Sequence, residues 1–493
     1  MSGGSGRAAA RQARAATSPW PAFTLFGWVA PPLDSTTSAR YAEYAGAGLD
    51  MTVLAWQDTG GVADNRRRLD CSRPVGVRNL LYDNYLDKVF PGIWQTYRWI
   101  DSTVAHYRGD TAFLGYYLGD EPTPNLFPPL AIYFTELRRR DPAHEPWNNL
   151  LGRMAFDTRD AWLQYTRDYV AAVHPSVLCN DHYEFIDDGT DRHQMIENIA
   201  GLASIARENG LPFWGIVLLT QHRGYRSVDA GLLRWQVAQW LSYGATGIGY
   251  FTYWTPAPDT FWNWQQGMIQ WGTGQRTWRY DFTRDLNRRL RPLGETLAGL
   301  QWLATAQAGS LPVGGTAFTP DSLLRGVDGR CALGRFTDAQ SRSHVFVANA
   351  DSATARTIVL HVNGAHGVSR LDSTGVWRAV TTTPESGGVA VTLPLAAGDF
   401  TLLRFDAVLD VVGAGPGPLS LIAGPNPARS MVRFAVDAMQ GEAHLELLDL
   451  RGRRVWSRRF HGSDATVGWT GLGDSGERVP PGVYFARLED ARA

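Results

Sequence analysis

The chain has 493 residues, is 44% hydrophobic and carries a formal net charge of −1. This length predicts two to four domains, and the balanced charge implies neither nucleic acid nor an acidic membrane surface as a partner. No apolar run approaches the ~20 residues of a membrane-spanning helix. The scattered cysteines, Cys71, Cys179 and Cys331, indicate neither a disulfide framework nor a metal site.

Residues 1–20 are rich in small and basic residues and poor in apolar ones. That composition predicts a disordered N-terminus, and the segment lacks the apolar stretch of a signal peptide. Either the protein stays inside the cell, or a leader has been removed from this sequence or misassigned in it.

Residues 21–305 show strand and helix patterns that alternate eight times. The predicted strands are 23–29, 51–56, 75–82, 113–119, 147–151, 177–183, 213–220 and 248–253. The predicted helices are 38–47, 62–69, a long helix after Pro91, 127–140, 158–173, 193–209, 230–243 and a last helix with the inner stripe Leu286, Leu290, Leu293, Leu297 and Leu300. Such alternation predicts a closed (β/α)8 TIM barrel. The alternative, an open doubly wound sheet, would usually carry a Gly-rich phosphate loop, and GWVAPP at 27–32 is not one.

After residue 305 the helical periodicity disappears and short β-type runs separated by Gly, Ser and Asp take its place. Residues 306–407 predict a β-sandwich, with strands near 343–348, 357–362, 389–393 and 400–405. The Gly- and Pro-rich residues 408–418 predict a linker, and 419–493 predict a third domain of short strands. The expected fold is therefore a TIM barrel followed by two all-β sandwich domains.

The fourth predicted strand ends in two acids. FLGYYLGDEP at 113–122 delivers Asp120 and Glu121 into a loop, and Pro122 forces the chain to turn. Catalytic residues of a barrel lie where the strands end, so Glu121 is our candidate proton donor, its pKa raised by burial among Tyr116 and Tyr117 and by an ionised Asp120. The alternative is that both acids only cap the next helix, although Asn125 is better placed for that.

The other strand ends deliver aromatic, amide and acidic side chains, which suit the apolar faces and the hydroxyls of sugars. The candidate substrate-binding residues are Trp28, Trp56, Tyr82, Asn148, His182, Tyr183, Gln221, His222, Tyr253 and Trp254. The loop at 250–278 adds Trp262, Trp264 and Trp271. The alternative is that these tryptophans only pack over the mouth of the barrel.

Glycoside hydrolysis needs a second group beside the proton donor. Asp181, at the end of the sixth strand, is one candidate for it, and Asp120 is the other, as the group that holds a substrate's own acetamido nucleophile. Glu184 is a weaker candidate, and Asp181 is alternatively a hydrogen-bond partner of His182. The sequence contains no nucleophile elbow, phosphate loop or metal-ligand spacing, so no cofactor and no metal are expected.

Residues 21–405 resemble glycoside hydrolases that have a TIM barrel followed by a small β-sandwich. The motifs that carry the likeness are GYYLGDEP (115–122), CNDHYEF (179–185) and YGATGIGYFTYW (243–254). The resemblance implies an acid/base after the fourth strand, which falls on Glu121. The family's nucleophilic glutamate after the seventh strand is absent, because Gln221 and His222 stand there. An Asp181 mechanism, a substrate-assisted Asp120–Glu121 mechanism like that of hexosaminidases, and a degenerate site all remain open.

The C-terminal part resembles the immunoglobulin-like module related to flagellar hook-capping and type IX secretion sorting domains. The matching motifs are GPNPARSMVRFAV (424–436), LELLDLRGRRV (445–455) and PPGVYFARLE (480–489). Within them, the residues at 449–452 predict a hairpin turn, and Pro481-Gly482 predicts a turn into a strand. The resemblance implies a secreted or cell-surface protein, attached or exported through this module.

The sequence therefore predicts a glycosidase that acts on a carbohydrate substrate with Glu121 as general acid. The alternative from another class is a non-catalytic carbohydrate-binding surface protein on a degenerate barrel, suggested by the missing strand-seven glutamate. A polysaccharide lyase is a third hypothesis.

Overall fold

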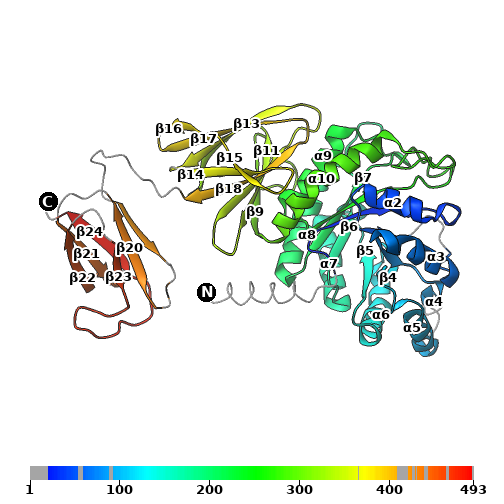
Figure 1. The fold of residues 1–493 in the computed structure, drawn as a ribbon, viewed down its shortest axis with the longest axis horizontal. Helices are drawn as coiled ribbons and strands as arrows, with labels where there is room; N and C mark the ends of the chain where they lie inside the picture. The colour runs from blue at the N-terminus through cyan, green and yellow to red at the C-terminus, as the bar shows by residue number, and fades with distance from the viewer. Residues whose placement is uncertain are drawn as a thin grey trace. The chain divides into compact units, whose positions relative to one another are not determined.

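The structure, a computed structural model, describes residues 20–53, 59–87, 93–364, 366–407, 420–424, 428, 430–437, 442–461 and 466–490. Contacts between residues divide the chain into two compact units, Met1–Val408 and Leu409–Ala493, which are described separately (Figure 1). Trp56, nearly all of the predicted disordered N-terminus and the predicted linker lie outside the described residues. Trp20, the last residue of that N-terminus, is buried, and its ring centroid lies 5.1 Å from that of Trp214.

Eight parallel strands form the barrel, as predicted. They are β1 (Thr24–Trp28), β2 (Met51–Val53), β3 (Arg78–Leu81), β4 (Phe113–Asp120), β5 (Glu145–Asn149), β6 (Leu178–Asp181), β7 (Phe213–Leu218) and β8 (Gly247–Phe251). Their order is β5-β4-β3-β2-β1-β8-β7-β6. The ring closes between β5 and β6, where the N–H of Leu150 donates to the carbonyl of Cys179 at 2.9 Å and Leu150 bridges Asn180.

The helices follow the strands in alternation. They are α2 (Ser38–Gly46), α3 (Val62–Ser72), α4 (Asn84–Asp87), α5 (Ile93–Tyr107), α6 (Phe127–Arg140), α7 (Arg159–Val173), α8 (Met195–Asn209), α9 (Ala230–Ser242) and α10 (Trp278–Ala298), with 3-10 turns η1 (Leu33–Ser35), η2 (Arg73–Val75), η3 (Pro124–Leu126) and η4 (Arg153–Ala155). Side chains of Thr37, Thr158, Asp229 and Thr277 cap α2, α7, α9 and α10. The leucine stripe predicted along the last helix is buried.

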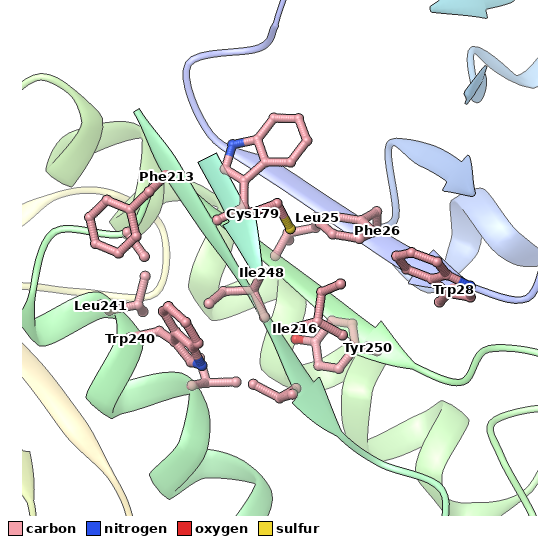
Figure 2. Packing of buried hydrophobic residues seen from close by; sticks show 14 of the residues in the cluster. Leu25, Phe26, Trp28, Cys179, Phe213, Ile216, Trp240, Leu241, Ile248 and Tyr250 are labelled. Atoms are coloured by element: carbon pink, nitrogen blue, oxygen red, sulfur yellow. The ribbon is translucent and has the colours of Figure 1, made fainter. Parts of the chain in front are cut away.

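Large aromatic rings fill the barrel interior. The centroid of Trp147 lies 5.8 Å from that of Trp28, 5.9 Å from Tyr117 and 6.4 Å from Trp214. Figure 2 shows part of the same buried cluster, in which Trp240 and Leu241 of α9 lie on the side of Ile248 of β8. A Cβ on Gly215 would stand 2.1 Å from the Trp240 ring, so only glycine lets this helix approach β7 so closely. Many of the chain's aromatic side chains are therefore packed in the barrel interior beneath the strand ends.

Two antiparallel sheets follow the barrel. The strands are β9 (Gln301–Ala308), β10 (Leu324–Asp328), β11 (Cys331–Thr337), β12 (Ser343–Asn349), β13 (Arg356–Asn363), β14 (His366–Leu371), β15 (Trp377–Ala379), β16 (Thr383–Glu385), β17 (Gly388–Leu395) and β18 (Phe400–Ala407). The six-stranded sheet has the order β15-β14-β18-β12-β11-β9, and the four-stranded sheet β10-β13-β17-β16. An apolar core that includes Leu333, Val347 and Leu360 lies between them. The sandwich packs on the barrel through α9, where Trp235 donates to the carbonyl of Ala350 at 3.2 Å.

The C-terminal unit is all-β. Its strands are β19 (Ser420–Gly424), β20 (Val432–Asp437), β21 (Glu442–Leu448), β22 (Arg454–His461), β23 (Thr466–Trp469) and β24 (Phe485–Asp490), in the sheets β19-β20-β23 and β22-β21-β24. Phe434, Leu445, Leu447, Val467 and Trp469 form its core. The predicted hairpin turn is confirmed, because the N–H of Gly452 donates to the carbonyl of Asp449 at 2.9 Å between β21 and β22.

Within the residues that the structure describes, no helix has both the length and the apolar character needed to cross a membrane.

Candidate functional site

Strand β4 ends in an unusual backbone. Gly119 has a φ of 111° and Glu121 a φ of 46°, and a side chain in this left-handed region costs roughly 1–2 kcal/mol. The Glu121 N–H donates to the carbonyl of Asn149 at 2.9 Å, and the hydroxyl of Tyr165 donates to the carbonyl of Pro122 at 2.9 Å. These bonds hold Glu121 in a strained conformation, a feature that clusters at functional sites.

One amide group joins two aspartates at the ends of neighbouring strands. The Nδ2 of Asn149 donates to Oδ1 of Asp120 at 3.0 Å and to Oδ1 of Asp181 at 2.6 Å. Asn149 lies opposite Asp120 in the register of β4 and β5, and it is only 2% exposed. The distance between Oδ1 of Asp120 and Oδ1 of Asp181 is therefore at most the sum of these two hydrogen-bond lengths. The reverse orientation of the amide would set its carbonyl oxygen against both carboxylates, so the hydrogen bonds fix its orientation.

The three carboxyls influence each other's protonation. Burial, followed by the charges of Asp181 and Asp120, raises the pKa of Glu121 to about 9. Asp120 is exposed, yet the surrounding protein and the charge of Asp181 raise its pKa to about 7, against the hydrogen bond from Asn149. Burial also raises the pKa of Asp181, against hydrogen bonds that include the one from Asn149. The set titrates together, so near neutral pH it holds a protonated Glu121 beside a carboxylate.

Neither acid of the DEP motif caps the following helix, so that interpretation is wrong. No side chain caps η3 or α6. Asn125, which is better placed in the sequence for that role, does not cap the helix either: its Oδ1 accepts the hydroxyl of Thr123 at 2.5 Å.

Tyr117 lies beside the three carboxyls. Burial raises its pKa, and so do the charges of Asp120, Glu121 and Asp181. Tyr116 points the other way: its hydroxyl donates to Asp141 at 2.5 Å, in a separate apolar cluster under α5 and α6. The prediction that Tyr116 buries Glu121 is therefore wrong. Strand alternation was the signal that could have separated the two tyrosines.

An aromatic wall continues from Asp181. The Tyr183 ring centroid lies 5.9 Å from that of His222, 5.4 Å from Tyr225 and 5.7 Å from Phe251. The His222 ring lies 4.7 Å from that of Trp264, which stacks on Trp262 at 5.5 Å with an angle of 18° between the planes. We call Tyr183, His222, Tyr225, Phe251, Trp262 and Trp264 the aromatic wall. The sequence did not single out Tyr225 or Phe251.

His222 is a neutral member of this wall. Its Nδ1–H donates to the carbonyl of Thr220 at 2.8 Å, and burial, aided by the charge of Arg223, lowers its pKa to about 4. The Nε2 atom is therefore left as a hydrogen-bond acceptor near neutral pH.

His182 and Glu184 form a structural pair. His182 is fully buried, and its Nε2 lies 3.3 Å from Oε2 of Glu184. The same Glu184 oxygen accepts the N–H groups of Gln194 and Met195 at 3.0 Å, which begin α8. Glu184 therefore caps a helix, and it, rather than Asp181, is the hydrogen-bond partner of His182.

The remaining candidates lie at various depths. Tyr253 is fully buried, with its ring centroid 4.5 Å from that of Tyr44, and Trp254 is buried under the guanidinium of Arg40. Asn148 is buried and donates to the carbonyl of Gly119 at 3.0 Å, so it supports the end of β4. Trp28, buried, has its ring 5.9 Å from that of Tyr117.

Tyr82 and Gln221 are half-buried, and the Tyr82 ring lies against Gly60. Trp271 is exposed and forms no part of the wall. Within the described residues, no group of three or more His, Cys, Asp and Glu side chains is arranged to hold a metal ion.

Neither a known protein family nor a curated protein matches the sequence. Solved structures with a similar fold include a β-galactosidase from the psychrophilic Marinomonas ef1, at 11% identity over 56% of this chain and 62% of that chain, with a TM-score of 0.44. This chain thus spans less than two thirds of that enzyme.

Two others are the endo-β-1,4-mannanase from Thermotoga petrophila and a β-L-arabinopyranosidase from Geobacillus stearothermophilus. The first has 8% identity over 89% of this chain and 97% of that chain, with a TM-score of 0.41. The second has 8% identity over 82% of this chain and 99% of that chain, with a TM-score of 0.44. Likeness this distant says nothing of the substrate or the site residues of this chain.

Proposed function

We propose that the protein is a glycoside hydrolase in which Glu121 donates the proton and Asp120 is the second carboxyl at the sugar. The observation that carries the proposal is the shared amide of Asn149. The side-chain amide of Asn149 binds both Asp120 and Asp181 at the strand ends. The backbone carbonyl of Asn149 accepts the N–H of Glu121 and so holds Glu121 beside them. Strand ends are where barrel enzymes place their catalytic groups.

The protonation of the set supports Glu121 as the acid. Its raised pKa keeps its carboxyl protonated near neutral pH. As the glycosidic C–O bond breaks, this proton passes to the leaving oxygen and Glu121 becomes a carboxylate. Positive charge then develops at the anomeric carbon, and a neighbouring carboxylate stabilises it.

Accessibility favours Asp120 over Asp181 as that neighbour. Asp120 is exposed, whereas Asp181 is 9% exposed and already accepts the shorter bond from Asn149. Asp120 acts either as the nucleophile that forms a covalent glycosyl intermediate or as the acceptor that orients a substrate acetamido group. Asp181 holds the Asn149 amide in place through the shorter hydrogen bond.

The aromatic wall supports a sugar as the ligand. Flat rings from the loops after β6, β7 and β8 stand together next to Asp181, and Trp262 and Trp264 are half-buried. Such rings bury the C–H faces of a pyranose, while the neutral His222 can accept a hydrogen bond from a hydroxyl group.

We also infer that the protein works outside the cell or at its surface. The motifs at 424–436, 445–455 and 480–489 support this inference, together with the all-β character of the C-terminal unit. Fractionation of cells that express the full chain tests it, because a protein found only in the cytoplasm would contradict it.

Screening the full chain on chromogenic glycosides and polysaccharides tests the main proposal. We expect the wild type to cleave at least one substrate and Glu121→Gln to bind it without cleavage. Glu208→Gln, on the exposed side of α8, is the matched control and should cleave normally. If the wild type and the variant both bind glycans and neither cleaves any, the protein is a carbohydrate-binding protein. Unsaturated products that absorb ultraviolet light would instead identify a lyase.

A further inference from the structure

Two arginines beside the aromatic wall lack an acidic partner among the residues that the structure describes. Arg192 is half-buried shortly before α8, and Arg223 is exposed in the loop after β7. Neither forms an ion pair with any residue that the structure describes, whereas Arg226, in the same loop as Arg223, pairs with Asp191 at 3.1 Å. Two unpaired cations next to a set of carboxyls need an explanation, because the simplest use of arginine here would be to neutralise those carboxyls directly.

Both guanidinium groups lie against rings of the wall or next to it. The Cζ of Arg192 lies 5.3 Å from the Tyr225 centroid, and the Cζ of Arg223 lies 4.2 Å from that of Phe261 and 5.2 Å from that of Trp262. Arg192 also donates to the carbonyl of Tyr183 at 3.3 Å. A guanidinium held by its flat face keeps N–H groups on its edge for a carboxylate or a sulfate.

Tyr225 connects these cations to the carboxyls. Its ring centroid lies 5.4 Å from that of Tyr183, the residue that follows His182 after Asp181. Burial raises the pKa of Tyr225, the charges of Arg192 and Arg223 oppose this, and those of Asp181 and Glu121 add to it. The phenol therefore lies within electrostatic reach of both arginines and of two of the carboxyls.

We propose that the substrate is an acidic glycan, and that Arg192 and Arg223 bind a carboxylate or sulfate group on a sugar next to the bond that is cleaved. This inference rests on the proposed glycosidase activity. Without these cations, the aspartate carboxylates of the site would repel an anionic sugar. With them, the site has an acidic end for the reaction and a basic end for recognition. If the arginines only balance the carboxyls, neutral glycans should bind equally well.

Binding to matched polysaccharides tests the inference. The full chain carrying Glu121→Gln is titrated calorimetrically with alginate and polygalacturonate, each against its esterified neutral form, and with κ-carrageenan against its desulfated form. The first two pairs test a carboxylate and the third a sulfate. We expect at least one acidic polymer to bind about tenfold more tightly than its neutral form, because the guanidinium groups form charge-assisted hydrogen bonds only with the charged form.

Arginine variants locate the effect. In the same background, Arg192→Gln and Arg223→Gln should each remove most of that difference, and Arg192→Lys should restore part of it, because lysine keeps the charge but not the planar fork. Arg98→Gln is the matched control: Arg98 is exposed on α5, with its Cζ 5.8 Å from the Trp99 centroid, and its loss should change nothing.

The outcomes separate this inference from the proposal beneath it. If a neutral glycan is bound as tightly as its acidic counterpart and is cleaved by the wild type but not by Glu121→Gln, the acidic-glycan inference fails and the glycosidase stands. If Arg98→Gln weakens binding as much as the other two substitutions, the effect is one of general charge and the inference also fails. If no glycan is bound or cleaved, both fail.

Discussion

Asn149 contacts Asp120 through both its side chain and its backbone position: its Nδ2 donates to Oδ1 of Asp120 at 3.0 Å, and the two residues are paired in the register of β4 and β5. The same nitrogen reaches Asp181, and the backbone carbonyl of Asn149 accepts the N–H of Glu121. A single residue on β5 thus positions all three carboxyls, so the strongest predictions concern their protonation.

Removing the Asn149 amide should change the pH dependence of the reaction. Its hydrogen bonds lower the pKa of Asp120 and of Asp181, so Asn149→Ala should raise both. The essential carboxylate then forms only at higher pH, and the acidic limb of the kcat/KM profile should move upward by about one pH unit. Asn363→Ala removes an amide hydrogen bond to the backbone carbonyl of Asp321 in the sandwich; it is the control and should leave the profile in place. An unchanged limb in Asn149→Ala would contradict this role.

The stability of the fold should report the raised pKa of Glu121. An acid whose pKa is higher in the folded state than in the unfolded one stabilises the fold below its unfolded pKa, near 4.3, and loses that contribution as pH rises towards about 9. Glu121→Gln should therefore melt at a higher temperature than the wild type at pH 8 and at nearly the same temperature at pH 4. Melting curves at the two pH values check this, and a variant less stable than the wild type at pH 8 would contradict it.

Tyr116 and Tyr117 offer a matched pair of substitutions. Tyr117→Phe removes a hydroxyl group beside the three carboxyls and keeps the ring. We therefore expect about a tenfold fall in kcat/KM with little loss of stability. Tyr116→Phe removes the hydrogen bond to Asp141 on the other face of β4 and should lower the melting temperature without slowing the reaction. If Tyr116→Phe slowed the reaction and Tyr117→Phe did not, the active site would not lie on the Tyr117 face of β4, and this account would be contradicted.

The aromatic wall should contribute to binding rather than to the chemical step. Trp264→Ala removes the ring between His222 and Trp262, and we expect KM to rise about tenfold with a smaller change in kcat. Trp271→Ala removes an exposed ring from the same loop and should have no effect. Equal effects of the two substitutions would argue that these tryptophans only stabilise the loop.

The sequence predicted the elements whose signals are local. Strand and helix patterns in alternation located the barrel strands, and the abrupt ends of β4 and β6 made Asp120, Glu121 and Asp181 candidates for the site. The function of Asn149 was not predictable in this way, because it depends on the pairing register of β4 with β5 and on the closure of the ring beside β6. These are contacts between residues distant in sequence.

The same limit applies to the alternative interpretation of Asp181 as the partner of His182, and to the two arginines. His182 follows Asp181 directly in the sequence, which suggests that the two are partners. In the structure Glu184, which accepts an N–H at the start of α8, is the partner of His182 instead. Arg192 and Arg223 lie in loops without periodicity, in a chain whose basic residues are almost all arginine. The ring contacts of Tyr225 and Trp262 and the hydrogen bond from Arg192 to the carbonyl of Tyr183 bring them to the site.

The most direct test of the central claim compares two leaving groups in one kinetic experiment. A general acid matters when the leaving oxygen is basic and matters little when it leaves unaided, as in a dinitrophenyl glycoside of the same sugar. We predict that Glu121→Gln lowers kcat/KM for the glycan by about 10²–10⁴ and leaves the dinitrophenyl glycoside almost unaffected. Equal losses on both substrates, or no loss on the glycan, would contradict Glu121 as the proton donor.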